Sequence, residues 1–249
     1  MKRNILIMLS ILGLIETKAQ SPEDYRIIEK DKPTSLNQLL VQTGAYSFEK
    51  QLIFSDLIGE NSWSFDTNKG EISFGENLVF PVQIIGTFSF SDNSWLWGWA
   101  NTQSGLPDNL LQQSFKLKSL GENWNIPELT VKQINNAEGI DHKIGMISAG
   151  LFNAKCYYLA NYGRGNLVVT IDSERIPIPS NTSAEKLISV FTQFISFTEV
   201  NHREALKNYL IDKKFEIVLG SNFIKAKSGE NFITAKFDEN GRLTEIKNK

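Results

Sequence analysis

The chain has 249 residues, of which 41% are hydrophobic and 22% are charged, and its formal net charge is −2 at pH 7. This length suits one large domain or two small ones, and 16 Phe and 5 Trp can fill a sizeable core. Because the chain has no basic excess, we expect no nucleic-acid partner. Its only cysteine, Cys156, excludes an intrachain disulfide and is expected to be a small buried side chain.

The first 19 residues have the layout of a secretory signal peptide. A positively charged start precedes an apolar run over residues 5–15, and Thr17 and Ala19 place small residues before a cut at Gln20. The run is too short for a membrane span, which needs about 20 apolar residues. We therefore expect an exported bacterial protein, periplasmic or secreted, with a mature net charge of about −4 and no membrane span after cleavage.

A polar leader over residues 20–34 is followed by the pattern of a long helix. Ser35 and Gln38 form a capping box, apolar residues recur every three or four positions, and Gly59 marks the end. The period then changes to two, which predicts an antiparallel meander of four strands. We expect these strands around Trp63 and Phe65, and over residues 71–74, 80–90 and 94–100.

The next segment mixes helices and strands. A helix is expected from Pro107 toward Gly121, because the fixed φ of proline suits a first helical turn. Thr182 with Glu185 is expected to cap another helix. Between them the pattern predicts a helix over residues 141–152 and strands over residues 155–161 and 166–172.

The last fifty residues change character and predict a small α+β appendage over residues 200–249. Asn201 caps a short helix, and several short strands follow it. Asn240-Gly241 is a strong hairpin signal, which pairs Lys236 with Glu245 and Ala235 with Ile246. The overall prediction is an α+β fold: a main domain over residues 35–199, with a meander sheet packed on the long helix, and this appendage.

The strongest pattern is a tryptophan hairpin over residues 84–101. Trp95, Trp97 and Trp99 are spaced by two, so a strand would point all three rings to one face. With Asp92-Asn93 as a two-residue loop, the predicted pairs are Phe90 with Trp95, Phe88 with Trp97, and Gly86 with Trp99. The opposite face would be small and flat, so that another group could approach it closely.

Two interpretations of the three rings stay open. They pack as core against the long helix, which we favour, or they form a platform for a sugar, a peptide or a partner protein. In the second case Asn101 and Gln83 would supply a polar rim. The burial of the three rings distinguishes the two interpretations.

The same residues carry a family resemblance. A helix with Phe-Glu-Lys-Gln, a meander that ends in Trp-Leu-Trp-Gly-Trp-Ala-Asn and a helix started by proline resemble an uncharacterised bacterial family, a domain of unknown function. The resemblance covers roughly residues 35–175 and implies no established activity, partner or catalytic residue. It rests on residues 48–51, Trp63, Asp66, Gly70, Phe74, Gly86, Thr87, residues 95–101 and Pro107.

No motif in the chain specifies a reaction. Glu49, Asp66 and Glu71 are the carboxylates that could form an acid–base pair, although solvated or ion-paired carboxylates are the commoner case. His142, His202 and Cys156 are too scattered for a metal site, and nothing indicates a cofactor. We therefore expect a non-enzymatic protein that binds a protein or a small molecule near the tryptophan hairpin. The alternative is a hydrolase of envelope polymers.

Overall fold

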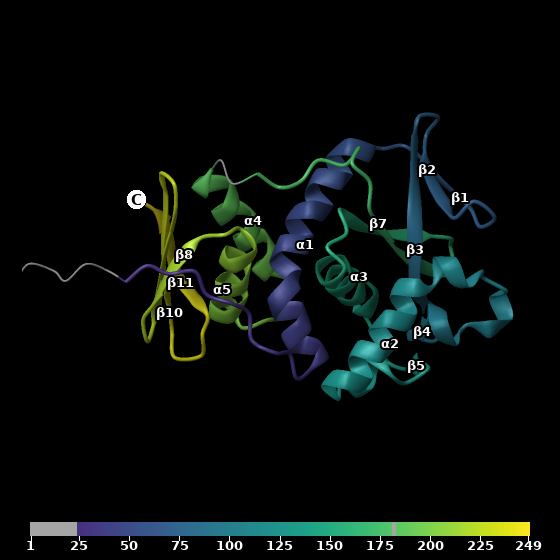
Figure 1. The fold of residues 1–249 in the computed structure, drawn as a ribbon, viewed down its shortest axis with the longest axis horizontal. Coiled ribbons are helices and arrows are strands. Elements are labelled where there is room, and N and C mark those ends of the chain that lie inside the picture. The colour runs from purple at the N-terminus through teal and green to yellow at the C-terminus, as the bar shows by residue number, and fades with distance from the viewer. Residues whose placement is uncertain (1–23, 181–182) are drawn as a thin grey trace, which may run out of the picture.

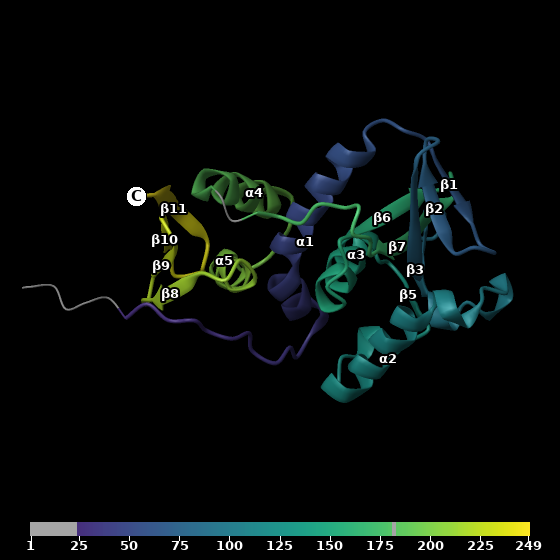
Figure 2. The ribbon, with the colours of Figure 1, turned by 45° about the horizontal axis from the view of Figure 1, so that its top comes forward.

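The computed structural model describes residues 24–180 and 183–249, and its central element is the helix α1, Leu36–Ile58 (Figure 1). The hydroxyl of Ser35 accepts a hydrogen bond from the amide of Gln38, and Gly59 follows the helix with a φ of +54°. Both ends confirm the helix that the capping pattern predicts. α1 lies between two antiparallel sheets, with helices on both of its sides (Figures 1 and 2).

Two glycines let neighbouring helices approach α1 from opposite sides. A Cβ added to Gly44 would lie 2.7 Å from the ring of Phe194 in α4, Ala184–Phe197. A Cβ added to Gly150 of α3, Ile140–Leu151, would collide with Thr43 of α1. Glycine weakens a helix interior, but here it permits the close approach that the packing requires.

The first sheet has seven strands in the part of the chain that the structure describes. Its strands β1 to β4 pair in sequence order and confirm the predicted antiparallel meander, and β5 extends it beyond β4. On its other side β3 pairs with β7, which in turn pairs with β6. The strands are β1 (Trp63–Asp66), β2 (Glu71–Phe74), β3 (Leu78–Ser89), β4 (Ser94–Trp97), β5 (Gln133–Ile134), β6 (Cys156–Asn161) and β7 (Gly165–Ile171).

Two helices accompany this sheet. α3 packs between α1 and strands β6, β7 and β3, and it confirms the helix expected over residues 141–152. α2, Gln112–Trp124, packs on β3. The chain after Pro107 first forms a 3₁₀ turn, Asp108–Leu110, and α2 continues past Gly121 until Asn125 adopts a φ of +55°. Cys156, the first residue of β6, is buried in the core, as expected.

The register predicted for the tryptophan hairpin is wrong by two residues. Phe88 pairs with Trp95 and Gly86 with Trp97, so the loop has four residues, 90–93, instead of two. A two-residue type I′ loop needs a positive φ at both central residues. Of Asp92 and Asn93, only Asn93 adopts one, at +49°.

Trp99 lies outside the strand that the spacing predicts for it. β4 ends at Trp97, and Trp99 lies in a 3₁₀ turn, Gly98–Ala100. Since the shift is by two residues, Trp95 and Trp97 stay on the predicted face together with Phe88.

The C-terminal unit, residues 183–249, contains α4, the helix α5 (His202–Asp212) and a second sheet of four strands. The expected pairs of Lys236 with Glu245 and Ala235 with Ile246 are confirmed. Ser183 provides a side-chain cap of α4, since its hydroxyl accepts from the amide of Lys186. Thr182, which the sequence predicted as the cap, lies outside the described residues. The strands are β8 (Glu216–Leu219), β9 (Phe223–Ser228), β10 (Asn231–Phe237) and β11 (Leu243–Asn248).

The described part of the leader runs beside this unit. Arg26 forms a β-bridge with Ile217 of β8, and the ammonium of Lys30 lies 2.6 Å from the carboxylate of Asp212. The expected signal peptide, residues 1–19, lies outside the described residues, as does the start of the leader. Within the described residues, every helix is too short or too polar to cross a bilayer. The proposed boundary at residue 199 stays a prediction, and α4 contacts both α1 and the second sheet.

Candidate functional site

Two of the three tryptophan rings belong to the core. Trp95 and Trp97 are both 0% exposed, and their ring centroids lie 5.3 Å apart in an edge-to-face arrangement. The indole of Trp97 donates to the carbonyl oxygen of Glu128 at 3.1 Å. The indole N–H of Trp95 has no hydrogen-bond partner among the described residues. Rings with no exposed face cannot stack on a ligand in this conformation.

Trp99 is the one ring of the three that reaches the surface. It is half-buried, and the ammonium of Lys118 lies 4.8 Å above its centroid. The side chain of Gln83 donates to the carbonyl of Asn109 and accepts from the amide of Gln113, so it holds α2 on the sheet. Asn101, which directly follows the 3₁₀ turn, is half-buried.

The flat opposite face of the hairpin is covered by α2. Ser114 of α2 donates to the carbonyl of Ile85 at 2.9 Å and accepts from the amide of Trp99 at 3.1 Å. A Cβ on Gly98 would lie 2.9 Å from Leu111. The group that approaches this small face is therefore a helix of the same chain.

The three candidate carboxylates do not meet. Glu49 of α1 is 1% exposed and binds Tyr209 of α5 and Lys213, the residue that follows α5. Asp66 and Glu71 face each other across β1 and β2, at the far side of the first sheet from α5. Asp66 accepts two backbone N–H bonds within its own turn, which gives it a structural role there.

Glu49 belongs to a buried ionic cluster between α1 and α5. The ammonium of Lys213 lies 2.9 Å from Glu49 and also donates to the carbonyl of Ser180. The hydroxyl of Tyr209 donates to Glu49 at 2.7 Å. Burial lowers the pKa of Lys213, although its bonds to Glu49 oppose that shift. Sequence reasoning missed this role of Tyr209 and Lys213, because the local pattern marks Tyr209 only as an apolar position of α5 and nothing in it distinguishes Lys213 from a solvated lysine.

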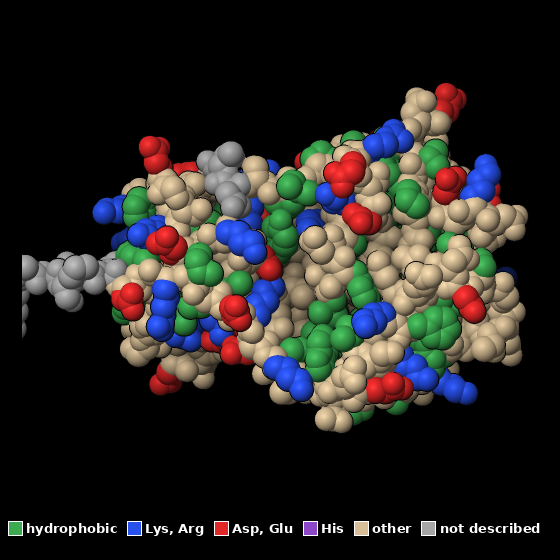
Figure 3. Space-filling view, viewed as in Figure 1, with side chains coloured by type: hydrophobic (Ala, Val, Ile, Leu, Met, Phe, Trp, Pro, Cys, Tyr) green, Lys and Arg blue, Asp and Glu red, His purple; other side chains and the backbone are tan. Residues whose placement is uncertain are grey.

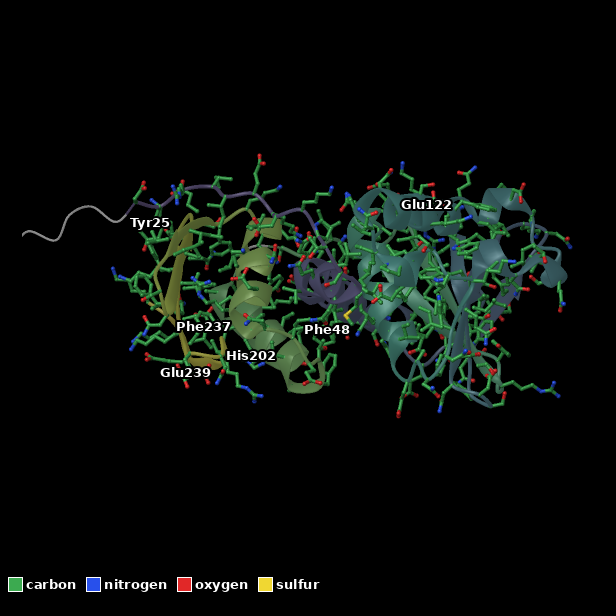
Figure 4. The ribbon with its side chains drawn as sticks, turned by 90° about the horizontal axis from the view of Figure 1, so that it is seen from below. Tyr25, Phe48, Glu122, His202, Phe237 and Glu239 are labelled. Atoms are coloured by element: carbon green, nitrogen blue, oxygen red, sulfur yellow. The ribbon has the colours of Figure 1, made fainter. Side chains whose placement is uncertain are left out.

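A cleft of about 1430 Å³ lies between α1 and the C-terminal unit. We call it the seam cleft. Its walls are the N-terminal turns of α1 and α3, the connection between α4 and α5, and the loop between β10 and β11. It brings together four basic side chains: His142, Lys143, His202 and Arg242. Figure 4 shows this side of the molecule, with His202 on the C-terminal unit and Phe48 on α1.

The electrostatics of the seam cleft favour an anion. The described residues that line it include two cations, Lys143 and Arg242, and one acidic residue, Glu199. The positive ends of two helix dipoles also favour an anion here, since the N-caps of α3 and α5, Gly139 and Asn201, both line the cleft. Burial, and then the charge of Arg242, lowers the pKa of His202, so this imidazole is neutral at pH 7.

Apolar side chains line another part of the seam cleft. Leu40, Met146, Ile195 and Phe197 contribute to it, and Phe197 is 61% exposed. A cleft with apolar walls and a few convergent polar groups is the usual form of a small-molecule site. Sequence reasoning placed both histidines on polar helical surfaces. Their convergence depends on the packing of helices sixty residues apart, for which no local signal exists.

Among the described residues, no group of three His, Cys, Asp or Glu side chains could hold a metal ion. Burial raises the pKa of the Cys156 thiol well above its usual value, which is typical of a structural cysteine.

The fold defines a two-part α+β protein in which one long helix joins two antiparallel sheets, with a cleft at the junction. The chain belongs to the family of unknown function DUF6882, whose sequence model matches residues 37–174. This confirms the family resemblance over the same part of the chain. No curated protein and no solved structure matches the chain. The family region thus supplies α1 and α3 to the seam cleft, and the segment beyond it supplies the opposite wall.

Proposed function

We propose that the protein is a non-enzymatic binding protein that holds a small anionic, partly apolar molecule in the seam cleft. The observation that carries the proposal is the convergence of Lys143, Arg242 and both histidines in this cleft of about 1430 Å³. The anionic group would lie by Lys143 and Arg242. The apolar part of the ligand would pack on Phe197 and its neighbours.

This proposal keeps the class of function expected from the sequence but moves the site. The tryptophan hairpin offers Trp99 and Asn101 at its rim, while its other rings are enclosed and its flat face is covered by α2. No observation favours the hydrolase alternative, because Glu49 is ion-paired and remote from Asp66 and Glu71.

Export remains part of the proposal and rests on the pattern of residues 1–19. Mass spectrometry of the protein recovered from outside the cytoplasm is expected to give a mature chain that begins at Gln20. Recovery of the intact chain only from the cytoplasm would contradict export.

The binding proposal is tested with anilinonaphthalene sulfonate, a fluorescent probe that is both apolar and anionic. We expect saturable binding, and at least about a tenfold loss of affinity when Lys143→Gln and Arg242→Gln are combined, since charged hydrogen bonds contribute about 1.5–3 kcal/mol each. The control combines Lys116→Gln with Lys132→Gln, which removes two exposed charges outside the seam cleft. Equal probe affinity in both double variants would contradict the site.

A further inference from the structure

The second sheet has one covered face and one open face. Ile224, Ala226, Ile233 and Ala235 are buried and point toward α4 and α5. α4 and α5 lie on one side of this sheet (Figure 2). Because side chains alternate along a strand, the neighbours of these residues in β9 and β10 point to the other side. Figure 4 shows Tyr25 of the leader on this outer side of the sheet.

The register gathers positive charge on the outer side. Lys225 and Lys227 of β9 lie across from Thr234 and Phe232 of β10, and Lys247 lies across from Thr234 on the other edge. With Lys236 and Lys249, the outer side carries five lysines against two glutamates, Glu216 and Glu245, within the described residues. We call it the basic face; its net charge of about +3 stands against −2 for the whole chain.

Aromatic rings lie between these lysines. The ammonium groups of Lys227, Lys225 and Lys249 lie 4.7, 5.7 and 5.5 Å from the ring centroids of Tyr25, Phe223 and Phe232. A shallow hollow of about 560 Å³ is centred on Thr234, and no acidic residue among those described lines it. Charged side chains are also denser over the C-terminal unit, at left in Figure 3, than over the family region.

The chemistry of the basic face suits a broad anionic surface. Its cations are lysines, which act as point charges on flexible stems, whereas arginine would indicate bidentate recognition of single phosphates. Aromatic rings beside lysines are also typical of side chains at a membrane interface. The charge of the face is therefore complementary to a bilayer that contains anionic lipid.

The path of the chain supports the same partner. The leader enters the described structure at the basic face, where Tyr25 lies beside Lys227. The apolar run predicted for export ends at Ile15. Nine residues separate Ile15 from Tyr25, and this length spans at most about 35 Å when fully extended. Until the signal peptide is removed, this face is therefore held close to the membrane.

We propose that the basic face docks on the surface of a bilayer that contains anionic phospholipid. The proposal is independent of the seam cleft, since the two surfaces share no residue. It assigns the C-terminal unit a role in holding the protein at a membrane surface while the seam cleft stays accessible.

The test uses the mature chain from Gln20 and measures its cosedimentation with vesicles. Vesicles of phosphatidylcholine with about one third phosphatidylglycerol are compared with phosphatidylcholine alone, at low and high salt. We expect salt-sensitive binding to the anionic vesicles only. Combining Lys225→Gln, Lys247→Gln and Lys249→Gln is expected to lower partitioning about a hundredfold, since each lysine near an anionic surface contributes about fivefold.

The matched control combines Lys69→Gln, Lys116→Gln and Lys132→Gln, which removes the same charge from exposed positions of the family region. It is expected to bind anionic vesicles nearly as well as the unmodified chain, with an unchanged melting temperature in both variants. Equal losses in the two triple variants, or no binding to anionic vesicles, would overturn the proposal. Tighter binding to a single-stranded oligonucleotide than to the vesicles, through the same lysines, would also overturn it.

Discussion

Two aromatic regions of this protein lie in opposite environments. Trp95 and Trp97 of the first sheet are buried in the hydrophobic core with no exposed surface. The indole N–H of Trp97 donates a hydrogen bond to the backbone carbonyl of Glu128. Phe197, at the seam between α1 and the C-terminal unit, is 61% exposed and contacts Phe48 with a centroid distance of 4.9 Å. Phe197 also lines the seam cleft beside its basic side chains, so it can contact a ligand there, whereas the two enclosed tryptophan rings cannot.

The largest expected effect tests the core role of the hairpin. Trp97→Ala is expected to lower the free energy of unfolding by about 3–5 kcal/mol, because it leaves a cavity and an unpaired carbonyl. Urea denaturation measures this loss. Probe affinity of the folded fraction is expected to be unchanged. Trp99→Ala is the control, with a smaller loss because Trp99 is half-buried; an equal loss would contradict the comparison.

The next effect tests the ionic cluster that holds α5 on α1 and so keeps the walls of the seam cleft together. Lys213→Met is expected to cost about 3 kcal/mol of unfolding free energy, because Glu49 then stays buried without its ion pair. Combining it with Glu49→Leu is expected to recover part of the loss. A double-mutant cycle from urea denaturation measures the coupling. Additive losses would show that the two side chains are not coupled.

A smaller effect on stability, but a clear one on binding, is expected at the exposed ring. Phe197→Ala is expected to lower the affinity for anilinonaphthalene sulfonate about fivefold, because apolar contact area is lost. The free energy of unfolding is expected to change by less than about 1 kcal/mol. Fluorescence titration and urea denaturation measure the two quantities. A large loss of stability without a loss of affinity would show that Phe197 stabilises the fold, as the core tryptophans do, and does not contact the probe.

The smallest effect concerns pH. The lowered pKa of His202 means that the unfolded chain binds a proton more readily than the folded chain. Stability is therefore expected to fall as the pH falls below about 6.5, the ordinary value for histidine. The imidazole Nδ1 accepts from the amide of Leu243, a bond that protonation would break. His202→Gln is expected to flatten the melting-temperature profile between pH 7 and pH 5; an unchanged profile would exclude His202 as the cause.

Local patterns predicted much of the fold. The caps at Ser35 and Asn201, the meander and the C-terminal hairpin register all depend on residues close in sequence, where capping, period and turn chemistry act directly. The tryptophan hairpin shows the limit of such reasoning. Its face was predicted correctly, but its loop length depended on which residues would accept a positive φ.

The sequence by itself determined the α+β elements, the strand faces and the family to which the chain belongs. Only the tertiary structure decided that two tryptophans are enclosed, that α2 covers their opposite face, and that Glu49 binds Lys213, 164 residues away. The same holds for the seam cleft, whose histidines come from α3 and α5. The physical reason is that a helix or strand is encoded by near neighbours. A cleft instead arises where the surfaces of separate elements meet, and no local period specifies which surfaces those are.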